Sequence, residues 1–371
     1  MRNRNQTPLD QIRDELKRKL KGINAASRKP SLVEKKLVGK IRRITEEQNL
    51  NNVTRTKAYL DFYLRHPEIH WAFFGHMVSR NGGYNMSDLK GEFLAKLMSK
   101  KDQETFFLFL ERGNWLIFQD IYPQFLLYEE SLKQNKPLFY LLPHFNVSSF
   151  METIWNHFWR NRDPYIHCMA MVVNEQSYLE YRVIQNQVYQ KEVLSKLEFM
   201  LQDLLSFNHI LFPYGREELI GQTLHHFESL HERILLGKRL YFVLFNNKDL
   251  LSQVVAWART HPHTGSRKDY WPHLFNDVNE GTPGFSFPLR LKSCRLNKGA
   301  RKFYSPKLEY AWKNVRQPKA EPGDWFQDLK VVDYLADELE NIDGEIRNEY
   351  CKTLERLEIA AFAKKTINFL E

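Results

Sequence analysis

Apolar residues recur at intervals of three and four along most of this chain, the spacing that places them on one side of an α-helix. Near the N-terminus this spacing comes with start signals, since Thr7-Pro8-Leu9-Asp10 precedes one apolar stripe and Ser31-x-x-Glu34 precedes another. Only residues 288–292 and 308–312 alternate apolar and polar side chains as strands do. We therefore predict an all-α or nearly all-α protein, one large multi-helix domain with, at most, a small β-hairpin near residues 288–312.

Glycine, proline and capping residues set the expected ends of the other helices. One helix should run from about residue 68 to 79 and stop at Asn81-Gly82-Gly83, because glycine supplies the positive φ of a C-terminal turn. Further helices are expected over residues 217–245, 325–342 and 345–370.

The organisation that this pattern predicts is simple. Residues 1–50 form a basic N-terminal helical segment, and residues 51–371 form the helical main domain. The loop 261–288 is rich in Gly, Pro, Asn and His, so a subdomain boundary would fall there.

Two features bear on the compartment. The most apolar stretch, residues 115–128, is interrupted by polar residues and is shorter than a membrane-spanning helix, and the N-terminus lacks a secretory apolar region. The three cysteines, Cys168, Cys294 and Cys351, are widely spaced, which indicates reduced thiols and a cytoplasmic protein.

Positive charge is concentrated in two segments. The formal net charge is +9, yet residues 1–43 alone carry +10 and residues 290–319 carry +9, while residues 320–371 carry −7. Such segments attract phosphate, so the leading hypothesis is binding of an anionic partner, nucleic acid or the inner membrane surface, through 1–43 and 290–319. The alternative is that a basic segment faces the acidic C-terminal region of the same fold. The candidate anion-binding residues are Lys17, Arg18, Lys21, Arg301, Lys302 and Lys307.

The segment 290–319 also places aromatic residues among its bases, namely Phe303, Tyr304, Tyr310 and Trp312. Bases with aromatic rings are typical of single-stranded nucleic acid binding, in which the rings stack on nucleobases. The same pattern is expected of a segment that packs its aromatic rings inward and exposes its lysines.

Histidines supply a second hypothesis, a metal- or histidine-dependent enzyme, although the sequence implies no particular cofactor. His66 and His70 lie four residues apart, a spacing at which two imidazoles on one helix can reach a single metal ion. Glu228-x-x-His231, with His225 nearby, resembles half of a di-metal carboxylate site. The alternative for these histidines is partly buried packing beside carboxylates.

Two further segments, 79–85 and 264–270, combine hydroxyl groups, arginine, glycine and an aromatic ring, a composition suited to an anion pocket. The enzyme hypothesis brings these segments and the histidines into one pocket. Its members are His66, His70, Arg80, Asn81, His225, Glu228, His231, Arg267 and Asp269.

Several long phrases of the chain, AYLDFYLRHPEIHWAFFGHMVSRNGGYNMSDLKG among them, resemble the YppC-like family of uncharacterised proteins from Bacillus-type Firmicutes. The resembling phrases occupy residues 58–91, 109–123, 141–152, 225–241 and 264–275. The resemblance covers about residues 50–330 and implies a cytoplasmic bacterial protein. It brings no activity, cofactor or catalytic residue, and it does not extend to the basic N-terminal region.

Overall fold

The computed structural model describes residues 7–22, 29–185, 209–280, 289–336 and 342–370. In these ranges the protein is mostly helical and its strands form only small pairs, so the predicted nearly all-α fold is confirmed. None of the helices in the described ranges is long and apolar enough to cross a lipid bilayer.

The α-helices differ widely in length. They are α1 (Pro8–Leu20), α2 (Leu32–Gln48), α3 (Asn52–Arg65), α4 (His70–Asp88), α5 (Leu94–Leu97), α6 (Lys100–Lys133), α7 (Ser149–Asn161), α8 (Pro164–Leu179), α11 (Leu230–Phe245), α12 (Lys248–Thr260), α13 (Leu308–Ala311) and α14 (Arg347–Leu370). Short 3-10 or π turns connect some of them, namely η1 (Phe139–Phe145), η2 (Glu180–Ile184), η4 (Arg267–Asp269) and η5 (Leu329–Leu335).

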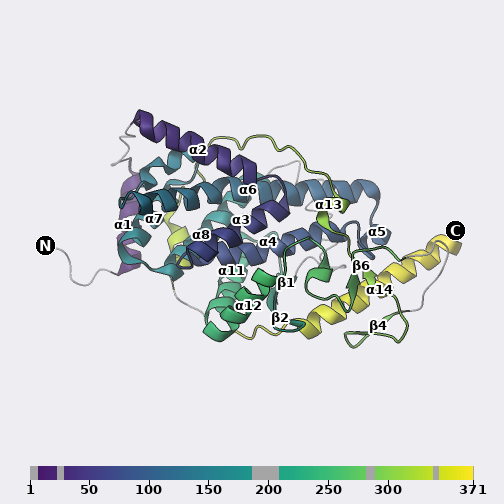
Figure 1. The fold of residues 1–371 in the computed structure, drawn as a ribbon. Coiled ribbons are helices and arrows are strands. Elements are labelled where there is room, and N and C mark those ends of the chain that lie inside the picture. The colour runs from purple at the N-terminus through teal and green to yellow at the C-terminus, as the bar shows by residue number, and fades with distance from the viewer. Residues whose placement is uncertain (1–6, 23–28, 186–208, 281–288, 337–341, 371) are drawn as a thin grey trace.

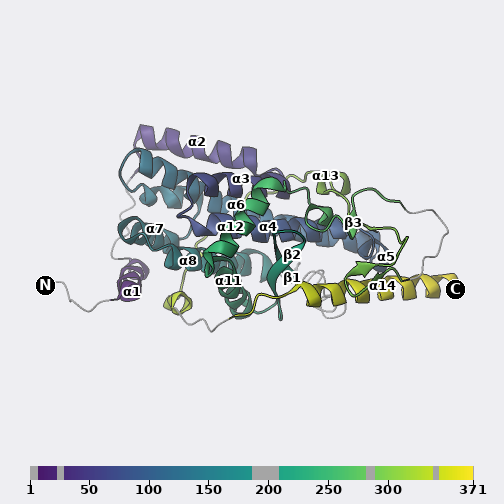
Figure 2. The same cartoon turned by 60° about the horizontal axis from the view of Figure 1, so that its bottom comes forward.

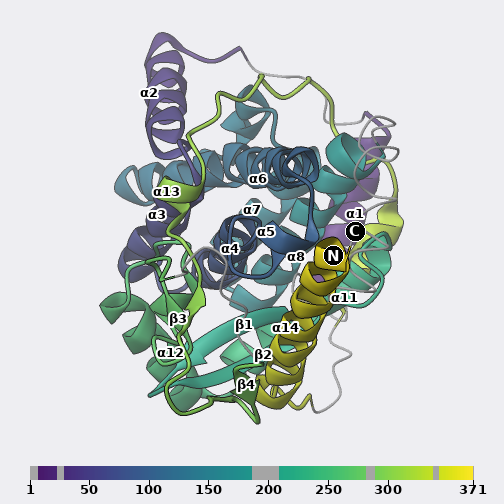
Figure 3. The same ribbon diagram turned by 90° about the vertical axis from the view of Figure 1, so that its right-hand side faces the viewer.

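Helix α4 is the centre of the molecule. It contacts α3, α6, α8 and the strand β1 (His209–Tyr214), and Figure 3 looks along it with these elements around it. Its buried residues lie on all sides of the helix and include polar ones such as Arg80, Asn81 and Asn85. A helix that is buried on all sides is typical of the core of a large protein.

The two N-terminal helices start where the sequence predicts. Thr7 and Asp10 form a capping box at the start of α1, and Ser31 and Glu34 form one at the start of α2. The apolar stripe of α1 packs on α7 and η5, and that of α2 packs on α6 (Figure 1). Most charged residues of both helices are exposed, although Arg13 and Lys40 pair with Asp333 and Glu130 of the domain.

The predicted end of the helix at Asn81-Gly82-Gly83 is wrong, because α4 continues to Asp88. The glycines allow close packing here instead of a turn. A β-carbon on Gly83 would lie 2.3 Å from Asn52 Oδ1 and 2.3 Å from His263 Nε2. Asn81 uses its side chain to pair with the backbone of Leu211 in β1, accepting from its N–H and donating to its carbonyl, both at 2.9 Å.

The expectation of one helix over 217–245 is wrong in its first third. Residues Glu218–Thr223 form β2, which pairs antiparallel with β1, and α11 begins only at Leu230. The turn between the strands contains Gly215 and Glu217, both with positive φ. Residues 218–223 become a strand because they pair with β1, which lies outside the segment 217–245. The spacing of apolar residues within the segment carries no information about that partner.

The small hairpin near 288–312 exists but is shorter than predicted. It consists of β4 (Leu291–Lys292) and β5 (Arg295–Leu296), while residues 308–311 form α13 instead of a second strand. Leu308 is buried and Trp312, four residues later, stacks on Phe107, so one helical turn puts both on the core side. The remaining strands, β3 (Phe275–Asn276) and β6 (Phe303–Tyr304), pair in parallel. Of the proposed boundary loop 261–288, residues 281–288 lie outside the described ranges.

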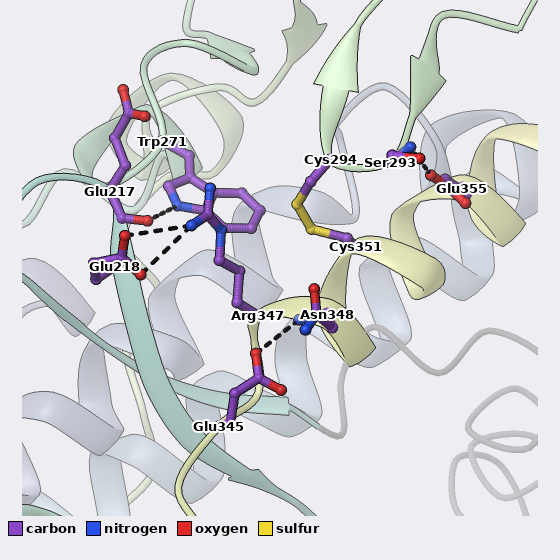
Figure 4. Close-up of a disulfide and its surroundings, with 10 residues drawn as sticks. All are labelled: Glu217, Glu218, Trp271, Ser293, Cys294, Glu345, Arg347, Asn348, Cys351 and Glu355. Atoms are coloured by element: carbon purple, nitrogen blue, oxygen red, sulfur yellow. Dashed lines mark hydrogen bonds and ion pairs between the residues drawn. A yellow bond between two sulfur atoms is a disulfide. The ribbon is translucent and has the colours of Figure 1, made fainter.

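At the C-terminus the long helix expected over 345–370 is confirmed as α14. The helix expected over 325–342 is wrong, because only the 3-10 turn η5 forms there among the described residues. Figure 2 shows α14 along one side of the molecule, below β1 and β2. Arg347 at its start forms an ion pair with Glu218 of β2 at 3.3 Å (Figure 4).

The predicted reduced state of all three cysteines is also wrong. Cys294, in the turn of the β4–β5 hairpin, forms a disulfide with Cys351 of α14, with the two Cα atoms 5.3 Å apart (Figure 4). Beside it, Glu355 of α14 accepts from the Ser293 backbone N–H at 2.7 Å. Cys168 is a buried free thiol. Residues that are far apart in sequence meet here, so spacing along the chain could not predict the pair.

Candidate functional site

A cavity of about 200 Å³ lies beside α4 in the core. Helices α3, α4, α6 and α8 form most of its wall, and β1 and the segment between β2 and α11 complete it. Its apolar lining residues are Trp71, Val78, Phe106, Phe109, Leu110, Ile117, Ile210, Leu224 and Phe227. Apolar walls of this kind enclose space in which water finds few hydrogen-bond partners.

Several hydrogen-bond donors in the cavity lining have no hydrogen-bond partner among the described residues, namely the Trp71 indole N–H and two groups on α3. The Arg55 Nε–H and the Tyr59 hydroxyl are both buried, on residues 1% and 3% exposed, and neither is bonded to a described residue. They lie one turn apart on α3, so they share one side of that helix. Buried donors without partners are rare in proteins and mark places where something else can accept the bond.

The charge of Arg55 is balanced by Glu111 of α6. Arg55 Nη2 donates to Glu111 Oε2 at 2.5 Å, and Arg55 Nη1 donates to Asn49 Oδ1 at 3.1 Å. Burial raises the pKa of the Glu111 carboxyl, while the Arg55 charge acts to lower it. The ion pair has no net charge. Of the guanidinium nitrogens, Nε is the one without a hydrogen-bond partner among the described residues.

Glu175 of α8 is the acidic residue of the cavity wall. Burial raises the pKa of its carboxyl to about 8, against the lowering effects of the Trp71 indole and the Gln176 amide. At neutral pH the carboxyl is therefore mostly protonated and acts as a further donor. Glu175 also affects Tyr59. Burial is the largest cause that raises the pKa of the Tyr59 hydroxyl, and the negative charge of Glu175 is the second.

A second buried carboxyl, Asp120 of α6, lies near the cavity. Its Oδ2 accepts from Asn174 at 2.6 Å and from Gln124 at 3.0 Å. Burial raises its pKa to about 7, and Oδ1 has no partner among the described residues. Asp120 therefore adds no full negative charge to this region below neutral pH.

The two segments predicted to form an anion pocket do meet, but their charged groups bind each other. Arg267 Nε donates to Asp88 Oδ2 at 2.7 Å, and Arg80 Nη2 lies 3.8 Å from Asp269 Oδ2. Arg267 also donates to the hydroxyls of Tyr270 and Tyr350. With Asn81 bonded to β1, these residues hold the 261–270 segment on α4, and the charge of each of the two arginines lies beside a carboxylate.

The histidines of the enzyme hypothesis do not share a pocket. His66 caps α3 and lies 3.0 Å from Glu129, whereas His70 begins α4, bonds the Tyr241 hydroxyl at 2.8 Å and stacks on Phe245. These contacts agree with the alternative interpretation, in which the histidines are partly buried and pack beside their hydrogen-bond partners.

The residues His225, Glu228 and His231 are exposed, and only His231 belongs to α11. No group of three or more His, Cys, Asp or Glu side chains in the described ranges is arranged to hold a metal ion. A metal site at His66 and His70 remains a prediction.

The candidate anion-binding residues lie at opposite ends of the molecule. Lys17, Arg18 and Lys21 are on or next to α1, at the left in Figure 1, and Arg301, Lys302 and Lys307 are near β6 at the right. Those on the right have protein partners: Arg301 pairs with Glu92, Lys302 donates to the Pro272 carbonyl and Lys307 lies 3.9 Å from Asp277.

Sequence reasoning singled out segment 79–85, which contributes Ser79 and Asn85 to the cavity wall, but it missed the polar lining residues Arg55, Asn114 and Glu175. A usable signal was present, since the acidic residues Glu111, Asp120 and Glu175 each interrupt a strongly apolar run. An acidic residue in such a run is buried or paired more often than it is solvated, and a buried one has a perturbed pKa.

Comparison with known proteins agrees with the resemblance seen in the sequence. Over 235 residues the chain is 43% identical to the uncharacterized protein YppC of Bacillus subtilis (strain 168), a match covering 63% of this chain and 73% of that protein. No solved structure matches the chain. A family model described as a protein of unknown function, DUF2515, matches residues 47–351, which include the whole cavity wall. The chain belongs to the DUF2515 family.

Proposed function

We propose that the protein binds a neutral, mainly apolar small molecule in the cavity beside α4 and holds it through one acceptor oxygen. The observation that carries this proposal is the pair of buried donors on α3, Arg55 Nε–H and Tyr59 O–H, which line one apolar cavity and have no hydrogen-bond partner among the described residues. A carbonyl, ether or hydroxyl oxygen of a ligand supplies the acceptor that the protein lacks there.

The charges of the wall favour a neutral ligand. Arg55 is paired with Glu111, and Glu175 is mostly protonated at neutral pH, so the lining has no net charge to offset. An anionic or cationic ligand would leave a buried charge uncompensated, which is costly in an apolar environment.

The size of the cavity supports a ligand of about one ring with a short substituent. An apolar cavity of about 150 Å³ is known to hold benzene, and this one is about 200 Å³.

Three isosteric probes test the proposal: acetophenone, which carries an acceptor oxygen, cumene, which lacks it, and benzoate, which is charged. Isothermal titration of the full chain at pH 7 should show acetophenone binding roughly tenfold more tightly than cumene, about 1.4 kcal/mol, with no benzoate binding. If all three fail to bind, or benzoate binds best, the proposal is wrong.

A further inference from the structure

The end of the molecule formed by the C-terminal part of α1 and the N-terminal part of α2 is strongly basic. Both parts lie at the left in Figures 1 and 2. Residues 17–22 and 29–36 hold seven Lys or Arg and one acid, Glu34. We call the following exposed residues the basic end: Lys17, Arg18, Lys21, Lys29, Lys35 and Lys36.

Of the seven bases, Lys19 pairs with Glu152 at 2.8 Å, while the six of the basic end are exposed. Glu34 is engaged by the Ser31 backbone N–H at 2.6 Å and by the Tyr140 hydroxyl at 2.5 Å. No ion pair joins Lys17, Lys21, Lys35 or Lys36 to another described residue, whereas in the other basic segment Arg290 pairs with Glu358 at 2.8 Å. The interpretation that a basic segment faces acidic parts of its own fold therefore suits 290–319 and not the basic end.

Exposed aliphatic side chains accompany the bases. Leu32 and Val33, at the start of α2, are 71% and 76% exposed, and Leu20, at the end of α1, is 42% exposed. The apolar stripes of both helices are already buried against the domain, so these three are extra apolar surface. Aliphatic side chains among lysines and arginines are typical of segments that lie on a membrane surface.

Aromatic side chains, which a single-stranded nucleic acid needs for stacking, are mostly unavailable in the second basic segment. Phe303 is buried, Tyr304 is half-buried and Trp312 stacks on Phe107 at 4.2 Å, whereas Tyr310 is 75% exposed. The basic end presents aliphatic side chains in their place. These observations favour lipid over nucleic acid.

We propose that the basic end docks on an anionic lipid surface. Its lysines and arginines pair with lipid phosphates, and Leu32 and Val33 enter the boundary between headgroups and acyl chains. The basic end precedes residue 47, where the family match begins, so docking is a property of the N-terminal segment and is independent of the cavity.

Vesicle co-sedimentation of the full chain tests this proposal. Vesicles of phosphatidylcholine with about 30% phosphatidylglycerol should bind the protein in low salt, and pure phosphatidylcholine vesicles should not. The quadruple variant Lys17→Gln/Lys21→Gln/Lys35→Gln/Lys36→Gln should bind about 100- to 1,000-fold more weakly, since each base near an anionic surface contributes up to roughly fivefold. The double variant Leu32→Ser/Val33→Ser should also bind more weakly.

The matched control changes four exposed lysines elsewhere, Lys100, Lys101, Lys292 and Lys298, to glutamine. It removes the same net charge and should bind as the wild type does. Equal loss in both quadruple variants, equal binding to both kinds of vesicle, or binding to a DNA duplex in preference to the anionic vesicles would overturn the proposal. Thermal melting confirms that each variant is folded.

Discussion

The indole ring of Trp71 lies against the backbone of Gly75, one turn later in α4, so closely that a β-carbon at position 75 would come within 2.5 Å of the ring. Trp71 is buried and forms part of the cavity wall. The glycine therefore sets the position of the wall, and the central helix sets the shape of the cavity.

Replacing Gly75 with alanine tests this relationship. In an exposed helix interior the change stabilises by up to about 1 kcal/mol, but here the ring must move, and we expect a loss of about 1–3 kcal/mol in the free energy of unfolding. Gly39→Ala in α2, where a β-carbon meets nothing within 4 Å, is the control and should stabilise. Urea unfolding measures both; a stabilised Gly75→Ala would show that the ring does not depend on the glycine.

The buried pair of Arg55 and Glu111 should be far more sensitive than a surface pair on the same helix. Arg55→Met leaves the Glu111 carboxyl without its partner, and the free energy of unfolding should fall by about 3–5 kcal/mol. Lys57→Met, which breaks the exposed pair with Asp61, should cost less than about 1 kcal/mol. Similar losses in the two variants would mean that Arg55 is not buried as described.

Stability should fall as the pH rises through the range in which Glu175 titrates. The pKa of its carboxyl is raised from 4.5 to about 8, so the unfolded chain releases this proton first. The stabilisation is complete below about pH 4.5, declines by up to about 1.4 kcal/mol per pH unit and is lost by about pH 8.

The variant Glu175→Gln cannot titrate and should flatten this part of the curve. Asp120, with its pKa raised to about 7, accounts for a residual slope. The exposed Glu104→Gln on α6 is the control and should retain the wild-type curve. Denaturant unfolding at pH 5, 6.5 and 8 is the measurement; identical pH profiles for wild type and Glu175→Gln would contradict the assignment.

The disulfide between Cys294 and Cys351 predicts the number of reactive thiols. Denatured without reductant, each chain should expose one thiol, that of Cys168, and after reduction three. The bond spans 57 residues, so reduction should also lower the free energy of unfolding by about 4 kcal/mol. Three thiols counted before reduction, in protein purified without reductant, would show that the two cysteines are only neighbours.

Local signals in the sequence predicted local structure well. Both capping boxes at α1 and α2 lie within four consecutive residues, and the structure contains them as expected. Where the outcome depends on distant partners, the predictions were wrong. Gly82 and Gly83 pack against Asn52, Asn114 and His263 and do not end α4, and residues 218–223 become a strand because β1 lies beside them.

The same limit applies to the candidate site. The sequence singled out segments 79–85 and 264–270, and the structure brings them together through Arg80 with Asp269 and Arg267 with Asp88. It could not predict that these charges neutralise each other. Nor could it predict the pairing of Arg55 with Glu111, 56 residues later, which leaves Nε free in the cavity.

The most direct test of the proposed function is to fill the cavity and measure binding again. Leu110 lines the cavity, while Leu108, two residues earlier on α6, is 46% exposed, so Leu110→Trp and Leu108→Trp are a matched pair. Titration with acetophenone should show wild-type affinity for Leu108→Trp and a loss of at least about tenfold for Leu110→Trp. Unchanged affinity in a folded Leu110→Trp variant would contradict the proposal that the ligand occupies this cavity.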